Sequence, residues 1–478
     1  MSVNSKMTAL ADEIRELSGT TTTKSIDAMT SDVSTANADI NEQAELIAQI
    51  ASAIEGKAGG SGGDTSAEDG LVTCDISSYT NSRVTRVGQR AFAYASMLQS
   101  VDFAKVTTIE PYAFNECSSL TTVNFPAAIN IGSYAFYSCS NLTATNFPVA
   151  TTIGSYAFYK CSNSLTTVNF PEVTTIESGA FGYDINLTTA SFPKAITIAG
   201  SAFSCCSKLT TASFPVATTI GSFAFRNCSN LVTVNFPEVT TIGTSAFYTC
   251  GSLATVNFPA VTTIGSSAFN TCKGLTTASF PAAITIGLSA FGACTNLATV
   301  SFPVATTIEG CAFRNCGLTT ADFPAVTIIG SSAFYTCSKL TTASFPVATS
   351  IGVDAFRACE SLTTISVPLA ATLANYAFSY CSRLTTASFP AVTSIGSYTF
   401  GSCFRLKELY LIGSSVCNLG ASNAFVSTPI AGYSDFAGYL GSIYVPASLL
   451  ASYRTATNWT YFSSRFVGIH GEGGTDPT

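Results

Sequence analysis

The sequence predicts an α/β-type repeat solenoid with a parallel β-sheet along one face, preceded by an α-helical coiled coil. Three observations lead to this fold class. A segment of about 22 residues recurs through most of the 478-residue chain, almost every copy ends on a cysteine, and residues 1–58 instead carry an apolar seven-residue period. Segments that recur at a fixed period are typical of solenoids, whose stacked units bury one continuous core.

Composition narrows the partners that the chain can have. It contains 21 Lys and Arg with no basic run, so nucleic acid is not expected as a partner. No apolar run approaches the ~20 residues that span a bilayer, so no membrane insertion is expected. The N-terminal segment lacks the apolar core of a secretory signal, so export by the general secretory route is not expected either.

The repeat is read most easily in "LATVNFPAVTTIGSSAFNTC", residues 253–272. The Phe of its "AF" pair recurs from Phe92 to Phe400 in steps of 22 residues, with one step of 23 and one of 21. Both changes of length fall between the Cys and the next Leu, which indicates a surface turn that tolerates insertion. A period of 22 lies within the range of leucine-rich repeats.

The first half of each copy predicts one short strand. Leu253, Val256 and Phe258 have the spacing of inward side chains, and Pro259 ends the strand because proline cannot continue a ladder. Stacked copies of this strand are expected to form the parallel sheet along one face of the solenoid.

The second half of each copy predicts a return to the opposite wall. Val261 and Ile264 are expected to point inward, and Gly265 to permit a turn. Ala268 and Phe269 then bury a small and a large side chain on that wall. Because one copy cannot cover this apolar stripe by itself, stacking is expected to bury it.

The cysteines predict a column of buried free thiols. Their expected Cβ spacing, about the distance between strands, exceeds the ~3.8 Å that a disulfide prefers. Metal binding would call for C-x-x-C pairs, which are absent, so we expect small hydrophobes and neither metal nor cofactor. Cys74, Cys205, Cys311 and Cys417 lie off the column and are expected to be partly exposed. The thirteen members follow the repeat Phe by three residues: Cys117, Cys139, Cys161, Cys206, Cys228, Cys250, Cys272, Cys294, Cys316, Cys337, Cys359, Cys381 and Cys403.

Residues 1–58 predict a coiled-coil stalk. β-branched residues at position a without Leu at d favour a parallel homotrimer, and an amphipathic helix packed on its own chain is the alternative. The predicted core positions are Ile26, Met29, Val33, Ala36, Ile40, Gln43, Ile47, Ile50 and Ile54. A Gly/Ser linker is expected at 59–70, a right-handed solenoid at 71–412, a C-terminal cap at 413–469 and a disordered tail at 470–478. Trp459, Tyr461 and Phe462 are expected to close the core in the cap.

Two sets of side chains are candidates for a binding surface. The outward strand positions form two files of small polar groups, which could bind a repetitive glycan weakly at many points, order water as ice-binding surfaces do, or simply keep the sheet soluble. The positions after the repeat Phe carry Tyr and Arg, which are common at the centre of interfaces, although turn positions also vary freely. The strand set is Thr122, Asn124, Thr167, Asn169, Thr211, Ser213, Thr255, Asn257, Thr277 and Ser279, and the turn set is Tyr137, Tyr159, Arg226, Tyr248, Arg314, Tyr335 and Arg357.

Catalytic chemistry is not expected. The one histidine, His470, lies in a Gly-rich tail, so a His-dependent triad or metal site is not expected. A glycosidase needs two carboxylates that face one cleft, and most copies of the repeat carry no carboxylate. We therefore predict that the chain is not an enzyme.

The motif "LTTVNFPEVTTIESGAF" and its relatives resemble the BspA-like, Treponema-type leucine-rich repeats of bacterial surface proteins, although Val261 stands where an Asn ladder is usual. Residues 441–469 look like the C-terminal segment of such proteins. The N-terminal "MTALADEIRELSG" looks like the leader of structural proteins from phages and prophages of gut Firmicutes. These resemblances imply a non-enzymatic adhesion protein: a phage tail-fibre-like arm that contacts a bacterial surface glycan or protein receptor, located on a virion tail. The alternatives are a BspA-like adhesin on the bacterial cell surface, directed at host matrix or other cells, and a polysaccharide-degrading fibre.

Overall fold

The computed structural model describes residues 77–162, 164–432 and 440–470. The chain divides into two compact units, Met1–Cys74 and Asp75–Thr478, and every described residue belongs to the second. The predicted stalk with its nine core positions, the predicted linker and residues 471–478 of the predicted tail lie outside the described residues.

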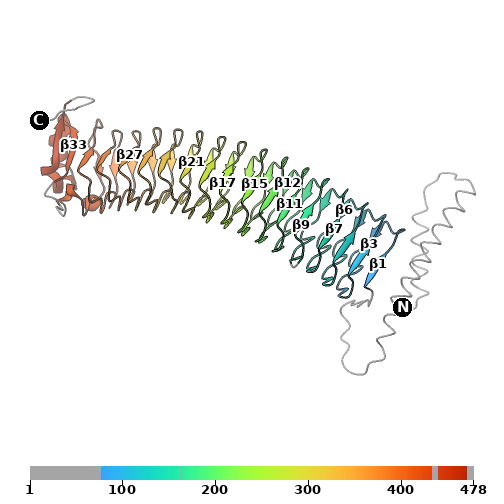
Figure 1. The fold of residues 1–478 in the computed structure, drawn as a ribbon. Coiled ribbons are helices and arrows are strands. Elements are labelled where there is room, and N and C mark those ends of the chain that lie inside the picture. The colour runs from blue at the N-terminus through green and yellow to red at the C-terminus, as the bar shows by residue number, and fades with distance from the viewer. Residues whose placement is uncertain (1–76, 163, 433–439, 471–478) are drawn as a thin grey trace, which may run out of the picture. The chain divides into compact units, whose positions relative to one another are not determined.

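The described chain is a parallel β-solenoid in which coils of about 22 residues stack in one row (Figure 1). Each coil contributes a three-residue strand followed by a two-residue strand, as β17 (Thr255–Asn257) and β18 (Thr263–Ile264) show. The described coils up to Phe400 contain no helix, since the first helix that the structure describes, η1 (Ser422–Phe425), follows β32 (Asn418–Leu419). The repeat prediction is thus confirmed, but its α/β type is corrected to an all-β coil.

The two-residue strands form one uninterrupted parallel sheet of sixteen strands. This second sheet was missed in the sequence, because two residues are too few to show the alternation by which a strand is recognised. Its strands are β2 (Arg86–Val87), β4 (Thr108–Ile109), β6 (Asn130–Ile131), β8 (Thr152–Ile153), β10 (Thr175–Ile176), β12 (Thr197–Ile198), β14 (Thr219–Ile220), β16 (Thr241–Ile242), β18, β20 (Thr285–Ile286), β22 (Thr307–Ile308), β24 (Ile328–Ile329), β26 (Ser350–Ile351), β28 (Thr372–Leu373), β30 (Ser394–Ile395) and β32 (Asn418–Leu419).

The three-residue strands of the coils form the predicted sheet in four separate parts, and the last part also contains the longer cap strands β33 and β34. The parts are β1 (Ser78–Thr80), β3 (Ser100–Asp102), β5 (Thr122–Asn124) and β7 (Ala144–Asn146); β9 (Thr167–Asn169), β11 (Thr189–Ser191), β13 (Thr211–Ser213) and β15 (Thr233–Asn235); β17, β19 (Thr277–Ser279) and β21 (Thr299–Ser301); and β23 (Thr320–Asp322), β25 (Thr342–Ser344), β27 (Thr364–Ser366), β29 (Thr386–Ser388), β31 (Glu408–Tyr410), β33 (Ser442–Pro446) and β34 (Phe466–Ile469). Two of the three breaks coincide with the 23-residue and 21-residue steps, after β7 and after β21. The irregular turn therefore interrupts this sheet, whereas the second sheet runs on.

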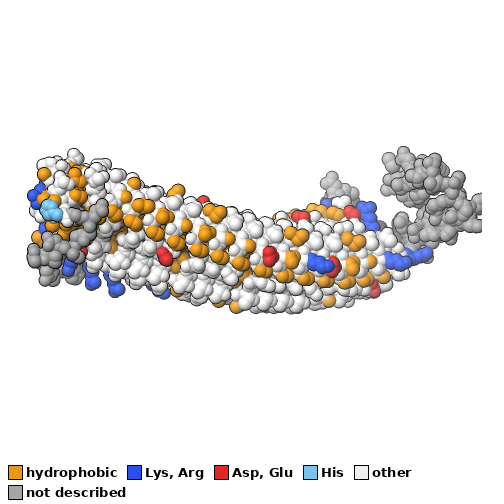
Figure 2. Space-filling model, turned by 90° about the horizontal axis from the view of Figure 1, so that it is seen from above, with side chains coloured by type: hydrophobic (Ala, Val, Ile, Leu, Met, Phe, Trp, Pro, Cys, Tyr) orange, Lys and Arg blue, Asp and Glu red, His pale blue; other side chains and the backbone are white. Residues whose placement is uncertain are grey.

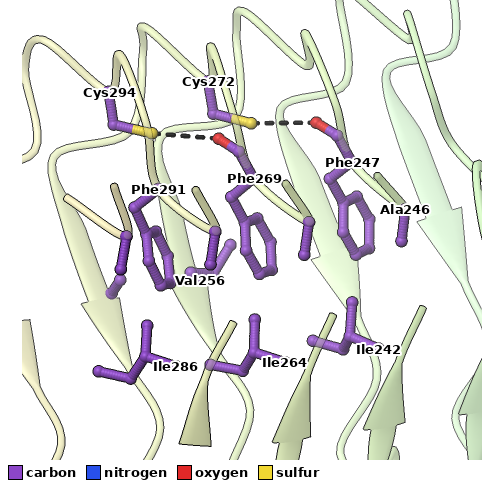
Figure 3. Close-up of a cluster of buried hydrophobic side chains, with 14 of the residues drawn as sticks. Ile242, Ala246, Phe247, Val256, Ile264, Phe269, Cys272, Ile286, Phe291 and Cys294 are labelled. Atoms are coloured by element: carbon purple, nitrogen blue, oxygen red, sulfur yellow. Dashed lines mark hydrogen bonds between the residues drawn. The ribbon is translucent and has the colours of Figure 1, made fainter. Parts of the chain in front are cut away.

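Identical side chains stack from coil to coil because the register pairs each residue with its counterpart in the next copy, such as Ala190 with Ala212. The predicted inward positions of the 253–272 copy are all buried. Two columns of Phe fill the interior. Within a column, Phe247 and Phe269 stack with centroids 5.1 Å apart (Figure 3). Phe258 of the other column tilts against Phe269 at 6.0 Å. Both are favourable aromatic geometries, so each ring is held from several sides.

The cysteine column is present, and all thirteen predicted members are buried and free. Each thiol also donates a hydrogen bond to the carbonyl of the repeat Phe in the preceding coil, as Cys272 does to Phe247 at 3.1 Å (Figure 3). The thiols are therefore hydrogen-bond donors that satisfy a buried carbonyl, which corrects their prediction as mere small hydrophobes. Burial raises the pKa of the Cys272 thiol well above its ordinary value, so the thiol keeps the proton that it donates.

Asp184 lies between Cys161 and Cys206, at the one rung from Cys117 to Cys403 that lacks a cysteine. Its side chain is fully buried, and neither carboxyl oxygen has a hydrogen-bond partner among the described residues. Burial raises the pKa of Asp184 well above its ordinary value.

Thiol labelling of the native chain should modify only Cys205, Cys311 and, at most, Cys74. Cys205 and Cys311 are partly exposed as predicted, Cys74 lies outside the described residues, and Cys417 is buried, which corrects its predicted exposure. Mass spectrometry after brief alkylation, with and without denaturant, measures this directly. Labelling of most column cysteines without denaturant would contradict the stack.

The glycine of the repeat is required by close packing. A Cβ on Gly265 would lie 2.6 Å from the backbone carbon of Gly243 in the preceding coil, a distance that real Cβ atoms essentially never show. The left-handed conformations of the turn fall instead on Ser267 and Thr271, with φ of 56° and 64°. The predicted turn role of Gly265 is therefore corrected, because the glycine lets two coils approach one another.

The cap closes the last coil by adding β33 and β34 to the sheet in parallel. Its helices are η1 (Ser422–Phe425), η2 (Pro429–Ala431), η3 (Ala447–Leu449), α3 (Leu450–Thr455) and η4 (Trp459–Arg465). Trp459 and Phe462 are buried as predicted, and the Trp459 indole donates to the Cys417 carbonyl at 2.7 Å. Tyr461 is 75% exposed, so its predicted burial is wrong, and the buried Tyr453 packs against Trp459 instead.

Candidate binding surfaces

The outward strand positions lie in straight files, as the register requires. Thr211 is exposed and Ser213 is half-buried, and the other eight predicted members are likewise exposed or half-buried. A short ladder of amides joins neighbouring coils on this face, since Asn124 donates to Asp102 at 2.8 Å and Asn146 donates to Asn124 at 2.6 Å. Shallow grooves on the face are lined by the side chains of 143–148 with 167–171 and of 320–322, 342–344 and 364–366. The sheet face is thus uniform, polar and shallow.

A second surface lies on the turn that carries the repeat Phe. We name it the aromatic–arginine ridge and define it as the side chains two residues before, one residue after and two residues after each repeat Phe, from Arg90 to Ser402. All seven members of the predicted turn set belong to it. The structure brings them together with a column that the sequence reading missed, formed by the residues two before the Phe: Arg90, Tyr112, Tyr134, Tyr156, Phe223, Tyr376 and Tyr398.

At the N-terminal end of the ridge, two columns of tyrosine lie side by side. Tyr134 stacks between Tyr112 and Tyr156, with centroids 4.8 and 5.0 Å away. Tyr137 stacks on Tyr159 at 5.3 Å, and the two columns touch where Tyr134 meets Tyr137 at 5.6 Å. Burial, and secondly the neighbouring tyrosines, raise the pKa of Tyr134, so its phenol stays protonated.

Arginine and tyrosine alternate at the C-terminal end of the ridge. The Arg314 guanidinium lies over the Tyr335 ring at 5.2 Å, and Arg357 lies over Tyr376 at 5.2 Å. Tyr376 stacks on Tyr398 at 5.0 Å. Midway along the ridge, Arg226 lies over Tyr248 at 5.8 Å. Each of these guanidinium groups thus lies within cation–π distance of an aromatic ring.

The tyrosines occupy backbone positions that disfavour them. Tyr112, Tyr134, Tyr156, Tyr376 and Tyr398 all have φ between 54° and 61°, in the left-handed region where a residue with a side chain is uncommon. Serine fills the same position in many other coils, so the turn itself has no need of a ring. The rings therefore contribute to the surface rather than to the turn.

The ridge is more basic than the chain as a whole. The sequence carries a formal net charge of −7, yet residues 77–470 contain 17 Lys and Arg against 13 Asp and Glu. The ridge carries five cations and two carboxylates. The cations are Arg90, Lys160, Arg226, Arg314 and Arg357, and the carboxylates are Glu116 and Asp354. Asp354 pairs with Arg357 at 3.1 Å. The face seen in Figure 2 differs, since its charged side chains are few and widely spaced among hydrophobic and uncharged polar ones.

Several of the described carboxylates form ion pairs that join neighbouring coils. Glu110 pairs with Arg86 at 2.9 Å and Glu172 with Lys194 at 2.6 Å, each across neighbouring coils. Within the described ranges, no group of His, Cys, Asp and Glu could hold a metal ion, and no helix is long and apolar enough to cross a bilayer.

The missed tyrosine column had a signal in the sequence. Tyr112, Tyr134 and Tyr156 are spaced by the 22-residue period, so they had to stack once the coils did. The residue two positions before the Phe reaches the same edge as the residue after the Phe only through a left-handed turn, and that conformation leaves no mark in the sequence.

Comparisons with known proteins agree on the repeats. The sequence pattern described as "BspA type Leucine rich repeat region (6 copies)" matches residues 72–188, 129–254, 196–319 and 306–430, which span most of the chain. A leucine-rich repeat protein from Bacteroides ovatus ATCC 8483 is 25% identical with a TM-score of 0.54, over 68% of this chain and 82% of that one. A leucine rich cell surface protein from Faecalibacterium prausnitzii A2-165 is also 25% identical, over 71% of this chain and 88% of that one, with a TM-score of 0.35. No curated protein matches the sequence.

Proposed function

This chain belongs to the family of BspA-type leucine-rich-repeat proteins, and from that premise we propose that it is a non-enzymatic adhesion protein whose aromatic–arginine ridge contacts the surface of a bacterial cell. Proteins of this family are surface proteins and commonly adhesins. The receptor is a glycan or a protein on the bound cell.

The observation that carries this proposal is the ridge itself. Tyrosine and arginine are the residue types that contribute most to binding at interfaces, and here they are stacked, partly exposed and held in place before any ligand arrives. The strand files offer only small groups, so each contact there would be weak. We therefore assign binding to the ridge and not to the sheet face.

Cell binding by fluorescent full-length protein tests the proposal. A ridge variant with Tyr134→Ser, Tyr156→Ser, Arg314→Asn and Arg357→Asn introduces residues that other coils already carry at the same positions, such as Ser245 and Asn270. We expect this variant to fold normally and to lose most of the binding to cells that the natural chain decorates.

The matched control changes the sheet face. Thr167→Val, Thr211→Val, Thr255→Val and Thr277→Val remove four outward hydroxyls and keep the β-branched shape that a strand favours. This variant should bind as the natural chain does. Loss of binding in the control with full binding in the ridge variant would contradict the assignment.

A phage or prophage tail fibre is the second candidate, favoured by the heptad at 26–54 and the phage-like leader sequence. In that setting a homotrimeric stalk would carry the repeat arms on a virion tail and multiply weak contacts into avidity. Light scattering on the full chain and on a chain that begins at Gly60 decides the stalk's part. A trimer that becomes a monomer on removal of residues 1–59 supports it, and the same state in both chains contradicts it.

A further inference from the structure

We infer that the aromatic–arginine ridge recognises an acidic polysaccharide, one that bears an anionic group only once in every few sugars. The inference rests on the proposed function and names the class of ligand that the ridge would bind.

The spacing of the cations along the ridge indicates how far apart the negative charges of a matching ligand would lie. Arg90, Lys160, Arg226, Arg314 and Arg357 follow one another at intervals of two to four coils, which is about 10–20 Å at ~4.8 Å per coil. A nucleic-acid strand carries one phosphate per ~3.4 Å along a duplex and would leave most of its charges unpaired here. A sparsely charged polymer matches these intervals.

The arginines are built to take a carboxylate or a phosphate. Arg226 and Arg314 rest on aromatic rings and form no ion pair among the residues that the structure describes. A guanidinium presents a planar fork of donors, which suits bidentate binding of a carboxylate. Both side chains are exposed, so their guanidinium groups are open to an anionic ligand.

The repeat distance of the tyrosine rings matches the length of the uncharged sugars that would lie between the anionic groups of the ligand. Along the solenoid their rings repeat at 4.8–5.0 Å, close to the length of one pyranose in an extended glycan. Each phenol hydroxyl can donate to a sugar hydroxyl or accept from one, and the exposed ring edges offer apolar area to the C–H groups of the sugar. Because the same groups recur in successive coils, the surface fits a repeating polymer better than one protein epitope.

A hollow between the two clusters continues the track. It is lined by Asn270, Ser289, Gly292, Arg314 and Asn315, where Gly292 and Ser289 remove the bulk that tyrosine provides elsewhere. Amides and hydroxyls in this hollow can bond to a sugar that passes from one cluster to the other.

The test measures binding of the full chain to immobilised polygalacturonate, in which the spacing of carboxylates is varied by partial methyl esterification. We expect binding to the partly esterified polymer and a loss of roughly tenfold or more on complete esterification, which removes the charges but keeps the sugar backbone. Arg226→Asn with Arg314→Asn and Arg357→Asn should cause a similar loss, as should Tyr134→Ser with Tyr156→Ser. The four-threonine control variant should bind normally.

Three outcomes would overturn the inference: equal binding to the fully esterified polymer, tighter binding to polyuridylate than to the acidic polysaccharide, or unchanged binding in both ridge variants. The proposed function fails separately. If the ridge variant loses cell binding while no acidic polysaccharide is bound, the ridge remains the adhesive surface and the ligand class is wrong. If polysaccharide binding depends on the ridge but cell binding does not, the inference stands and the proposed function falls.

Discussion

Phe225→Ala is expected to lower the free energy of unfolding by about 3–5 kcal/mol, the usual cost of truncating a fully buried Phe. The Phe225 ring is completely buried and stacks between Phe203 and Phe247, with centroids 5.4 and 5.3 Å away. Truncation leaves a cavity that neighbouring coils cannot close, because their positions are fixed by the continuous sheet of two-residue strands. Urea unfolding followed by circular dichroism measures the loss.

The matched control lies two residues away in the same coil. Phe223 is on the ridge, 37% exposed, with φ of 62°, and Phe223→Ser introduces the residue that Ser245 provides in the next coil. Its effect on stability should stay within about 0.5 kcal/mol. Similar losses for the two variants would contradict the separation of a structural column from a binding ridge.

Asp184→Cys is expected to raise the stability of the solenoid by about 1–3 kcal/mol, the cost of a buried polar group without a partner. The new thiol would complete the column between Cys161 and Cys206 and donate to the Phe158 carbonyl, as the thirteen thiols donate to the repeat Phe carbonyl of the preceding coil. The gain should appear as a shift of the urea midpoint at neutral pH.

The contribution of Asp184 to the free energy of unfolding should fall as pH rises. Most carboxylates show the opposite dependence, because folding lowers their pKa. Burial raises the pKa of Asp184 in the folded chain above its value in the unfolded chain, so folding holds the proton more tightly than unfolding does. The stability contribution of Asp184 is therefore fully present below the unfolded pKa of ~3.9 and is lost as pH rises through the folded pKa. The groups beside Asp184 are the thiols of Cys161 and Cys206, which burial keeps protonated over this range.

The advantage of Asp184→Cys over the natural chain should accordingly grow as pH rises from acid to neutral. Asp184→Asn, which has nearly the same shape and no titration, should show no such growth relative to Asp184→Cys. A difference between the natural chain and Asp184→Cys that stays constant from pH 4 to pH 8 would contradict a buried, proton-holding carboxyl.

The core could be predicted from the sequence because every copy of the repeat carries the same apolar pattern. The inward positions found in one copy therefore apply to all the others. Leu253, Val256 and Phe258 show the strand period once, and fifteen copies of the Phe confirm the wall on which Phe269 lies. The two-residue strand β18 could not be predicted, since its hydrogen bonds run to other coils and leave no local period. The role of Gly265 was likewise hidden, because it depends on how closely Gly243 of the neighbouring coil approaches.

The candidate site could be predicted only in part. Tyr137, Arg314 and the other turn residues were singled out by type, but their stacking depends on the left-handed turn that places Tyr134 beside Tyr137. Asp184 was missed because the cysteines were counted and the gap in their column was not. Its burial follows from its place in the repeat, where even a carboxyl must take the position of a thiol.

Hydroxyl-radical footprinting of the full chain bound to cells tests the central claim most directly, because it reports which side of the solenoid the cell covers. Tyr410 and Tyr444 stack at 4.5 Å on the sheet face and serve as internal references for the ridge tyrosines. The ridge account predicts that Tyr134, Tyr156 and Tyr335 lose reactivity on binding while Tyr410 and Tyr444 keep theirs. Protection of Tyr410 and Tyr444 with unchanged ridge tyrosines would contradict it.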